Sequence, residues 1–216
     1  KANIHNGLEI NSWKATSAAD QWIRIDTFSA STSADALAII GHNLGTVSAD
    51  LSLWYSTTGA WAGEQVAVVA SFAVASDGPI LKEFTQQTAR YWGVFMAGAM
   101  TAAPEIQIAM LCNKTELDYA STSYDPHAQT AVSEVNTTQG GYVSGIFTSY
   151  IEREMTLAFQ DADAALYAKV KAWWEGNGMK QFLVAYETAN SPNDVFLMRP
   201  DGKFNNPLTN GGAYRD

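Results

Sequence analysis

Hydrophobic and polar residues alternate along several short segments in the first half of the chain. In Asp50–Ser56, the side chains of Leu51, Leu53 and Tyr55 fall on one face, since successive side chains of a strand point to opposite sides. The run Ala36–Ile40 is continuously apolar, which is typical of a strand covered on both faces. Many short strands at nearly regular spacing predict a β-sandwich. The other segments with a strand pattern are Gln21–Thr27, Gln65–Val69, Ser71–Val74, Arg90–Met96 and Ile106–Leu111.

The pattern changes after Leu111. Residues 113–150 are polar and contain few aliphatic side chains, which predicts long loops or extended arms with scattered strands. Glu152–Phe159 alternates and predicts a strand, whereas Asp161–Glu175 has apolar residues at helical spacing and predicts one α-helix. Two further strands and a loop-like tail follow, and the last residues read as the start of another strand. These segments are Lys180–Tyr186, Val195–Arg199, Asn205–Gly212 and Ala213–Asp216.

The change of pattern places a domain boundary near residues 112–115. We therefore expect a mainly β protein with a sandwich domain over residues 1–112 and a second β-rich domain over residues 113–216. The second domain would carry the arm or loops at 113–150 and the helix at 161–175. A chain of 216 residues is long enough for two such domains.

Composition narrows the range of possible functions. The net charge is −9 without a basic run, which excludes the electrostatic footprint expected for nucleic acid or an anionic membrane. Charged residues make up 16% of the chain, below the usual ~25%, which favours surfaces that neighbours cover. The single Cys112 cannot form an intrachain disulfide or a Cys-based zinc site. No apolar run is long enough for a membrane span, and the chain starts without Met, as a piece of a longer product would.

No set of residues typical of a catalytic site is evident in the sequence. The three histidines lie in separate segments, and His42 with Asn43 stands in the turn Gly41–Gly45 directly after an apolar strand. Two interpretations fit His42: a base or ligand at a strand end, or a turn histidine whose ring bonds to nearby backbone, which we favour. The pair Asp161 and Asp163 is best explained by the start of the helix. No cofactor or metal motif is found.

Exposed aromatic side chains can stack on sugars. Trp61 lies near the tip of a hairpin turn predicted at Ser56–Ala60 and is the best candidate for an exposed glycan contact. Trp92 within a strand and Trp173 on the apolar helix face are expected in the core.

The order of these motifs resembles a family of phage tail proteins. The first half is similar to a discoidin-type, galactose-binding-like jelly roll, and the second half to a distal-tail-type, split-barrel-like domain. The segments that carry the first likeness are Asn11–Thr16, Gln21–Asp26, Ala36–Leu44, Leu53–Gly59 and Arg90–Val94. Those that carry the second are Arg153–Phe159, the helix with Trp173 and Trp174, Gln181–Val184 and Val195–Leu197.

The resemblance implies a non-enzymatic virion protein at the distal tail or baseplate, made in the host cytoplasm. Its expected partners are other tail proteins and copies of itself in a homohexameric ring, which links the tail tube to the host-recognition apparatus. Neither a cofactor nor a metal, nucleic acid or membrane partner is implied. Two other hypotheses remain: a carbohydrate-binding module for host surface glycans that uses the loop around Trp61, and a tail-associated hydrolase.

Overall fold

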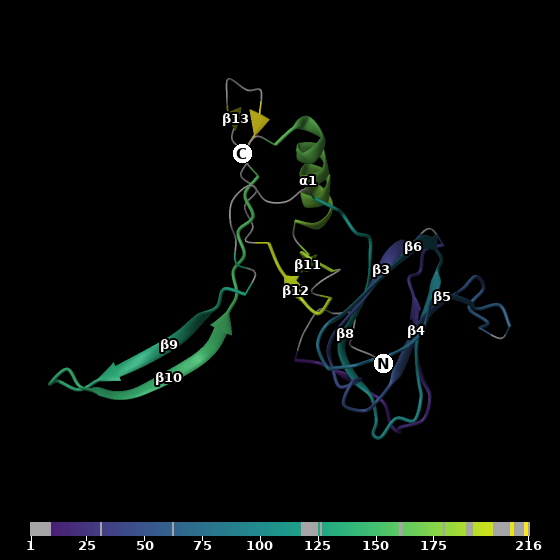
Figure 1. The fold of residues 1–216 in the computed structure, drawn as a ribbon, viewed down its shortest axis with the longest axis horizontal. Helices are drawn as coiled ribbons and strands as arrows, with labels where there is room; N and C mark the ends of the chain where they lie inside the picture. Colours follow the sequence, from purple (N-terminus) through teal and green to yellow (C-terminus); the bar gives the residue numbers. More distant parts are fainter. Residues whose placement is uncertain are drawn as a thin grey trace. The chain divides into compact units, whose positions relative to one another are not determined.

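The computed structural model divides the chain into two compact units (Figure 1), which are described separately. The first comprises Lys1–Thr115 and Met179–Asp201, and the second Glu116–Gly178 and Gly202–Asp216. The residues that the structure describes are 10–30, 32–61, 63–117, 125, 127–159, 162–178, 180–188, 192–200, 208–209 and 214–215.

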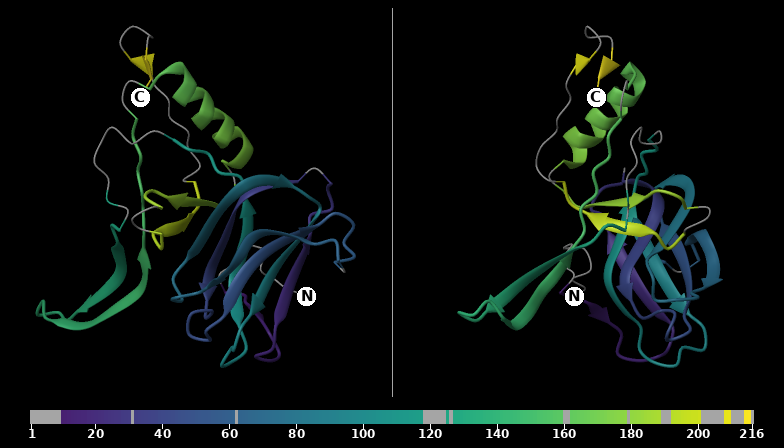
Figure 2. Two further views of the ribbon diagram at one scale, coloured as in Figure 1. Left: turned by 45° about the vertical axis from the view of Figure 1, so that its right-hand side comes forward. Right: turned by 60° about the vertical axis from the view of Figure 1, so that its left-hand side comes forward.

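The first unit contains a β-sandwich of two four-stranded sheets, which lie face to face in both views of Figure 2. All pairings are antiparallel, and most neighbours come from distant parts of the sequence, as β2 and β7 do. One sheet has the order β1-β8-β3-β6, with β1 at Trp13–Lys14, β8 at Glu105–Cys112, β3 at Ser33–His42 and β6 at Ile80–Thr88. The other has the order β2-β7-β4-β5, with β2 at Gln21–Asp26, β7 at Tyr91–Ala97, β4 at Asp50–Ser56 and β5 at Val66–Ala73.

The inner faces of the two sheets form one hydrophobic core. Trp92 is completely buried there, its ring packs near Tyr55 and Phe84, and its Nε1 donates to the Ala89 carbonyl oxygen at 3.1 Å. Because the buried indole keeps a hydrogen-bond partner, its burial carries no unpaired donor. The other fully buried large side chains are Leu37, Ile39, Leu44, Val47, Leu51, Leu53, Val94, Met96, Ile106 and Ile108. The mainly β fold is thereby confirmed.

Two strand predictions need correction. The two segments expected at Gln65–Val69 and Ser71–Val74 are one strand, β5, whose pairing with β4 contains register shifts. Strand β6 has no counterpart in the predictions, because Glu83, Gln86 and Gln87 give its sequence a polar appearance. It is an edge strand, so polar side chains reach solvent there.

The first unit also contains a short hairpin of β11 (Phe182–Ala185) and β12 (Val195–Met198), in which Val195 and Phe196 are buried. This hairpin belongs to the sandwich unit, whereas the sequence places residues 113–216 in one domain.

In the second unit, β9 (Thr130–Thr137) and β10 (Val143–Glu152) form a long antiparallel hairpin. Two register shifts interrupt it, one between Val143 and Gly145 and one between Thr148 and Tyr150. Residues 153–159, predicted as a strand, have no regular secondary structure, so this prediction is wrong. Alternation of Met155, Leu157 and Phe159 alone does not make a strand without a partner to pair with.

The helix α1 spans Ala164–Asn177, slightly later than predicted. Asp163 is its N-cap, and its side chain accepts a hydrogen bond from the Leu166 amide at 2.8 Å. Asp161 lies outside the described residues. Two short strands, β13 (Leu208–Thr209) and β14 (Tyr214–Arg215), pair within the C-terminal segment. The strands described after residue 112 form three two-stranded sheets, so the split-barrel detail has no counterpart among them.

Candidate functional site

Trp61 is buried, with 8% of its surface exposed, so the prediction of an exposed indole at a hairpin tip is wrong. Its φ of 64° lies in the left-handed region, which costs a non-glycine residue about 1–2 kcal/mol. This conformation turns the side chain back onto the outer face of the sheet, against Gly93 of β7. A β-carbon at Gly93 would lie 2.7 Å from the Trp61 ring, so only glycine leaves room for the indole.

Trp61 is part of an aromatic cluster on the outer face of the sheet β2-β7-β4-β5. Register places Trp22 beside Phe95, and Gly93 between Arg24 and Trp54. The Trp22 and Phe95 rings are stacked with their centroids 4.5 Å apart. The centroid of the Trp22 ring lies 5.5 Å from that of Trp61 and 6.4 Å from that of Trp54. Trp22, Trp54 and Phe95 keep partial exposure, so the aromatic cluster presents ring surface to solvent.

Arg24 projects from the same face of β2 and is exposed. Its guanidinium carbon lies 5.7 Å from the centroid of the Trp22 ring and 5.3 Å from that of Trp61, which is cation–π range. Among the described residues Arg24 forms no ion pair. Asp26, an acidic residue on the same face of β2, accepts hydrogen bonds from the Nε and Nη2 atoms of Arg90 at 2.8 and 3.0 Å.

The loop between β4 and β5 is held around one carboxylate, that of Glu64. It accepts hydrogen bonds from the Ser56 hydroxyl, from the Thr57 hydroxyl at 3.1 Å and from the amides of Ala60 and Trp61 at 3.1 and 3.3 Å. The bond to Ser56 is the main reason that the pKa of Glu64 is lowered to about 2. The loop therefore holds Trp61 in place while its carboxylate is ionised.

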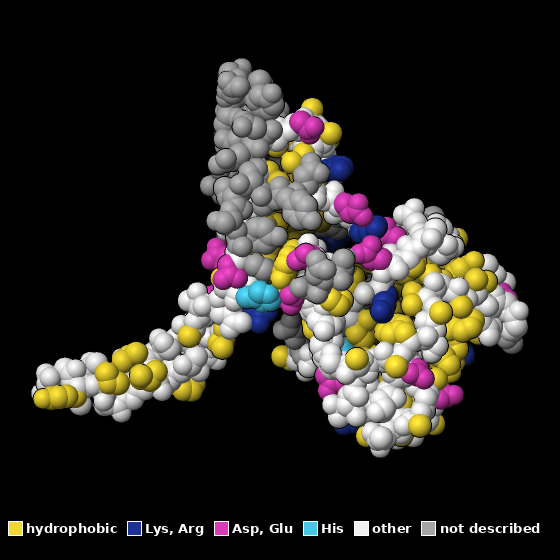
Figure 3. Space-filling model, in the orientation of Figure 1, with side chains coloured by type: hydrophobic (Ala, Val, Ile, Leu, Met, Phe, Trp, Pro, Cys, Tyr) yellow, Lys and Arg dark blue, Asp and Glu magenta, His cyan; other side chains and the backbone are white. Residues whose placement is uncertain are grey.

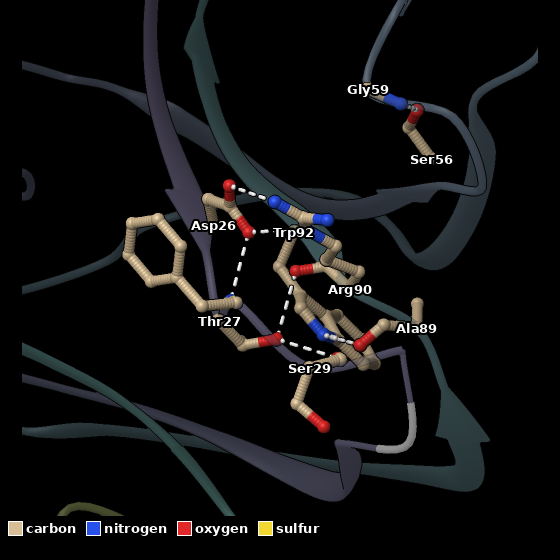
Figure 4. A network of polar contacts seen from close by, with 9 residues as sticks. Asp26, Thr27, Ser29, Ser56, Gly59, Ala89, Arg90 and Trp92 are labelled. Carbon is tan, nitrogen blue, oxygen red and sulfur yellow. Dashed lines mark hydrogen bonds and ion pairs between the residues drawn. The ribbon is translucent and has the colours of Figure 1, made fainter.

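A second polar network fixes the ends of β2 and β7 beside the cluster (Figure 4). The Thr27 amide and hydroxyl both lie 3.0 Å from the carbonyl oxygen of Arg90, whose guanidinium pairs with Asp26. This ion pair lowers the pKa of Asp26 and raises that of Arg90. The strands that carry the aromatic cluster are thus tied together at one end.

His42 and Asn43 serve the turn after β3. The His42 Nε2 lies 2.8 Å from the Gly78 carbonyl oxygen and donates to it, while Nδ1 accepts from the Leu44 amide at 3.2 Å. Burial lowers the pKa of His42, in keeping with the neutral ring that these two bonds require. The Asn43 amide links the turn to the start of β8, because its Oδ1 accepts from the Glu105 amide at 2.7 Å. Both ring nitrogens of His42 are occupied, as in a turn histidine.

The β9–β10 hairpin is the second distinctive surface. Pairing places Val135 and Ile146 on one face with Ile151, and Phe147 on the opposite face with Tyr150. The exposed fractions are 68% for Ile146 and 64% for Phe147, and Figure 3 shows apolar side chains along the length of the hairpin. The hairpin therefore exposes apolar side chains on both faces.

Other chemistry is sparse in the part of the chain that the structure describes. There, no group of three or more His, Cys, Asp or Glu side chains could hold a metal ion. Burial raises the pKa of the Cys112 thiol to about 11, so the thiol is protonated at neutral pH. No helix in the described ranges has the length and hydropathy to cross a membrane.

Sequence reasoning found Trp61 but missed its companions. Trp22 and Arg24 alternate with Ile23 and Ile25 in β2, so both faces of that strand have large side chains and the pattern does not reveal which face is outer. The available signal is Gly93, a glycine inside an aromatic strand, which often marks close approach by another group.

No family model matches the chain, and no curated protein matches it. Solved structures similar to its β-sandwich include a pectin-binding carbohydrate-binding module, 18% identical over 54% of this chain and 81% of that chain, with a TM-score of 0.42. A second carbohydrate-binding module, in complex with 4,5-unsaturated mannuronic acid, is 19% identical over 52% of this chain and 84% of that chain, with a TM-score of 0.43. A chitosan-binding module from Paenibacillus sp. IK-5 is 15% identical over 48% of this chain and 77% of that chain, with a TM-score of 0.39. The likeness is one of fold.

Proposed function

We propose that the chain is a non-enzymatic structural subunit of a phage tail tip or baseplate, which joins copies of itself into a ring between the tail tube and the host-recognition apparatus. The tail context follows from the resemblance of the sequence. The observation that carries the assembly role is the β9–β10 hairpin, which exposes apolar side chains on both of its faces.

A two-stranded hairpin without a covered face is at best marginally stable in water. Within the described residues of β9 and β10, no side chain is buried. Burial of Ile146 and Phe147 requires cover on opposite faces, which two neighbours supply. In a ring closed by head-to-tail contacts, every subunit has two such neighbours.

The charge of the hairpin also favours protein neighbours. Its strands and turn contain Glu134 and Glu152 and neither Lys nor Arg, so nothing in it attracts phosphate groups or an anionic lipid surface. The strands also lack the Lys and Pro residues that protect free sheet edges from pairing with other chains. A second copy of the chain is the occupant that we assign to each face.

The test measures the mass of the purified whole chain by light scattering, with negative-stain imaging. We expect a ring of defined stoichiometry. Ile146→Lys and Phe147→Lys place a charge on opposite faces of the hairpin, and each should reduce the mass to that of a monomer. Thr88→Lys, at an exposed position on the edge strand β6, is the control and should leave the ring intact.

A wild-type chain that stays monomeric at every concentration would contradict the proposal. If only one of the two face variants changes the mass, the hairpin contacts a single neighbour. The mass of the wild type then distinguishes a ring closed by that one contact from a two-fold dimer.

A second candidate function is carbohydrate binding by the sandwich. The aromatic cluster of Trp22, Trp54, Trp61 and Phe95 favours it, since partly exposed indoles offer the flat apolar surface on which a sugar ring can lie. A panel of glycans should contain a ligand whose binding is lost in Trp22→Ala and kept in Trp173→Ala. Equal binding by both variants would exclude the aromatic cluster as the site.

A further inference from the structure

We infer that the aromatic cluster with Arg24 is a binding site for acidic saccharides, in which the sugar ring stacks on indole and the sugar carboxylate pairs with the guanidinium. This inference rests on carbohydrate binding as the function of the sandwich, and it names the class of ligand.

The first argument is the position of the cation. A uronic acid bears its carboxylate on the same ring that stacks, so the matching cation must stand next to the indole that the sugar ring covers. Arg24 lies over the Trp22 and Trp61 rings, with its guanidinium carbon 5.7 and 5.3 Å from their centroids, and the partly exposed Trp54, whose ring centroid lies 6.4 Å from that of Trp22, offers ring surface beside it. A guanidinium can bind a carboxylate through two parallel hydrogen bonds, which fixes the orientation of the sugar.

The second argument is that the cation is available. The carboxylates of Asp26, on the same strand face as Arg24, and of Glu64, which binds the Trp61 amide, both have other partners. Asp26 binds Arg90 and the Phe28 amide, at 2.8 Å in each case, and Glu64 is enclosed by the donors of its own loop. Arg24 is exposed, and among the residues described its guanidinium contacts only indole rings and forms no ion pair.

The third argument is rigidity. The indole of Trp61 is fixed between Gly93 and the Glu64 loop, and Trp22 is stacked on Phe95. A surface that is already ordered loses little conformational entropy when a ligand binds.

A single cation also distinguishes the ligand class, since polyphosphates and nucleic acids need several basic side chains and the net charge here is −9.

The test is calorimetric titration of the whole chain with a tetrasaccharide of galacturonic acid and with its methyl ester. The ester keeps the rings and removes the charge. We expect the acid to bind at least about 10-fold more tightly than the ester, the difference that one charge-assisted contact supplies. Added salt should weaken binding of the acid and leave the ester unaffected.

Arg24→Gln should remove the preference for the acid, and Arg24→Lys should retain part of it. The control is Lys82→Gln, which removes a cation that lies 4.3 Å from the Phe72 ring elsewhere on the sandwich, and it should bind like the wild type. The comparison of acid with ester in the wild type needs no variant, so a folding defect cannot obscure the result.

Each outcome has one meaning. If the wild type binds acid and ester equally, and Arg24→Gln does the same, the acidic class is wrong while carbohydrate binding stands. If Lys82→Gln loses the preference and Arg24→Gln keeps it, the site lies elsewhere. If the wild type binds neither these ligands nor a panel of neutral glycans, carbohydrate binding itself is excluded.

Discussion

The sandwich and the β9–β10 hairpin are both antiparallel β-structure, yet they differ in how far their apolar side chains are buried. In the sandwich, two sheets cover each other, and residues such as Leu51 and Trp92 have no exposed surface. In the hairpin, Ile146 and Phe147 are more than half exposed. The sandwich therefore covers its apolar side chains in its own core, whereas no side chain described in the two strands of the hairpin is buried. Truncation of a side chain should reveal this difference directly.

The largest effect is expected at Trp92, at the centre of the sandwich core. Trp92→Ala removes a fully buried indole and its hydrogen bond to Ala89, which should lower the free energy of unfolding by about 3–5 kcal/mol. Urea unfolding followed by circular dichroism measures this change. A loss below about 1 kcal/mol would show that this core does not determine the stability of the sandwich.

The next effect concerns the outer face of the same sheet. Gly93→Ala places a methyl group 2.7 Å from the Trp61 ring, which forces the indole away and should cost about 1–3 kcal/mol. Tryptophan emission should shift to longer wavelength as Trp61 becomes exposed. Gly145→Ala is the matched control in the hairpin, because no atom lies within 4 Å of the added carbon. Similar effects at the two glycines would contradict the packing described for Trp61.

Acid should weaken the sandwich through Glu64. Its pKa is about 2 in the folded chain against an ordinary 4.5, mainly because the Ser56 hydroxyl stabilises the ionised form. The resulting stabilisation is complete above about pH 4.5 and is lost as the pH falls from there towards 2. Glu64→Gln should show no such loss, so the difference in unfolding free energy between wild type and variant should shrink over this range. A difference that is constant with pH would exclude this role.

The smallest effect is expected in the hairpin. Phe147→Ala removes a ring that is 64% exposed, so the unfolding free energy of the unassembled chain should change by no more than about 0.5 kcal/mol. The same urea experiment measures it beside Trp92→Ala. A cost of several kcal/mol would show that the hairpin is already covered within one chain, and the contrast between the two regions would fail.

The fold of the sandwich could be predicted from sequence because burial on one face imposes alternation. The pattern in Asp50–Ser56 is an example, and β4 has these same bounds. Edge strands obey this rule weakly, so β6 was missed. Alternation also misleads where no partner strand is present, as in residues 153–159. Local patterns report the exposure that a segment needs, while pairing depends on the rest of the chain.

The candidate site was less predictable. The sequence singles out Trp61 by its place in a loop, but its burial depends on Gly93, which lies 32 residues away, and on the carboxylate of Glu64. Such contacts are set by tertiary structure, and strand periodicity contains no information about them. The bond from the Leu44 amide to the His42 ring is local and is of the kind that a short strand-to-loop segment suggests, whereas the bond from His42 to the Gly78 carbonyl joins residues 36 positions apart and depends on tertiary structure.

The strand order of the sandwich has a kinetic consequence. Gln21 of β2 pairs with Met96 of β7, and Trp13 of β1 with Ile106 of β8, so both sheets close only after most of the first unit is available. Such non-local pairings fold in milliseconds to seconds, whereas a hairpin such as β9–β10 forms in about 1–10 μs. During synthesis the strands of the sandwich leave the ribosome first and the hairpin follows. The order of synthesis therefore lets the slowly folding sandwich strands begin to pair before the hairpin is complete.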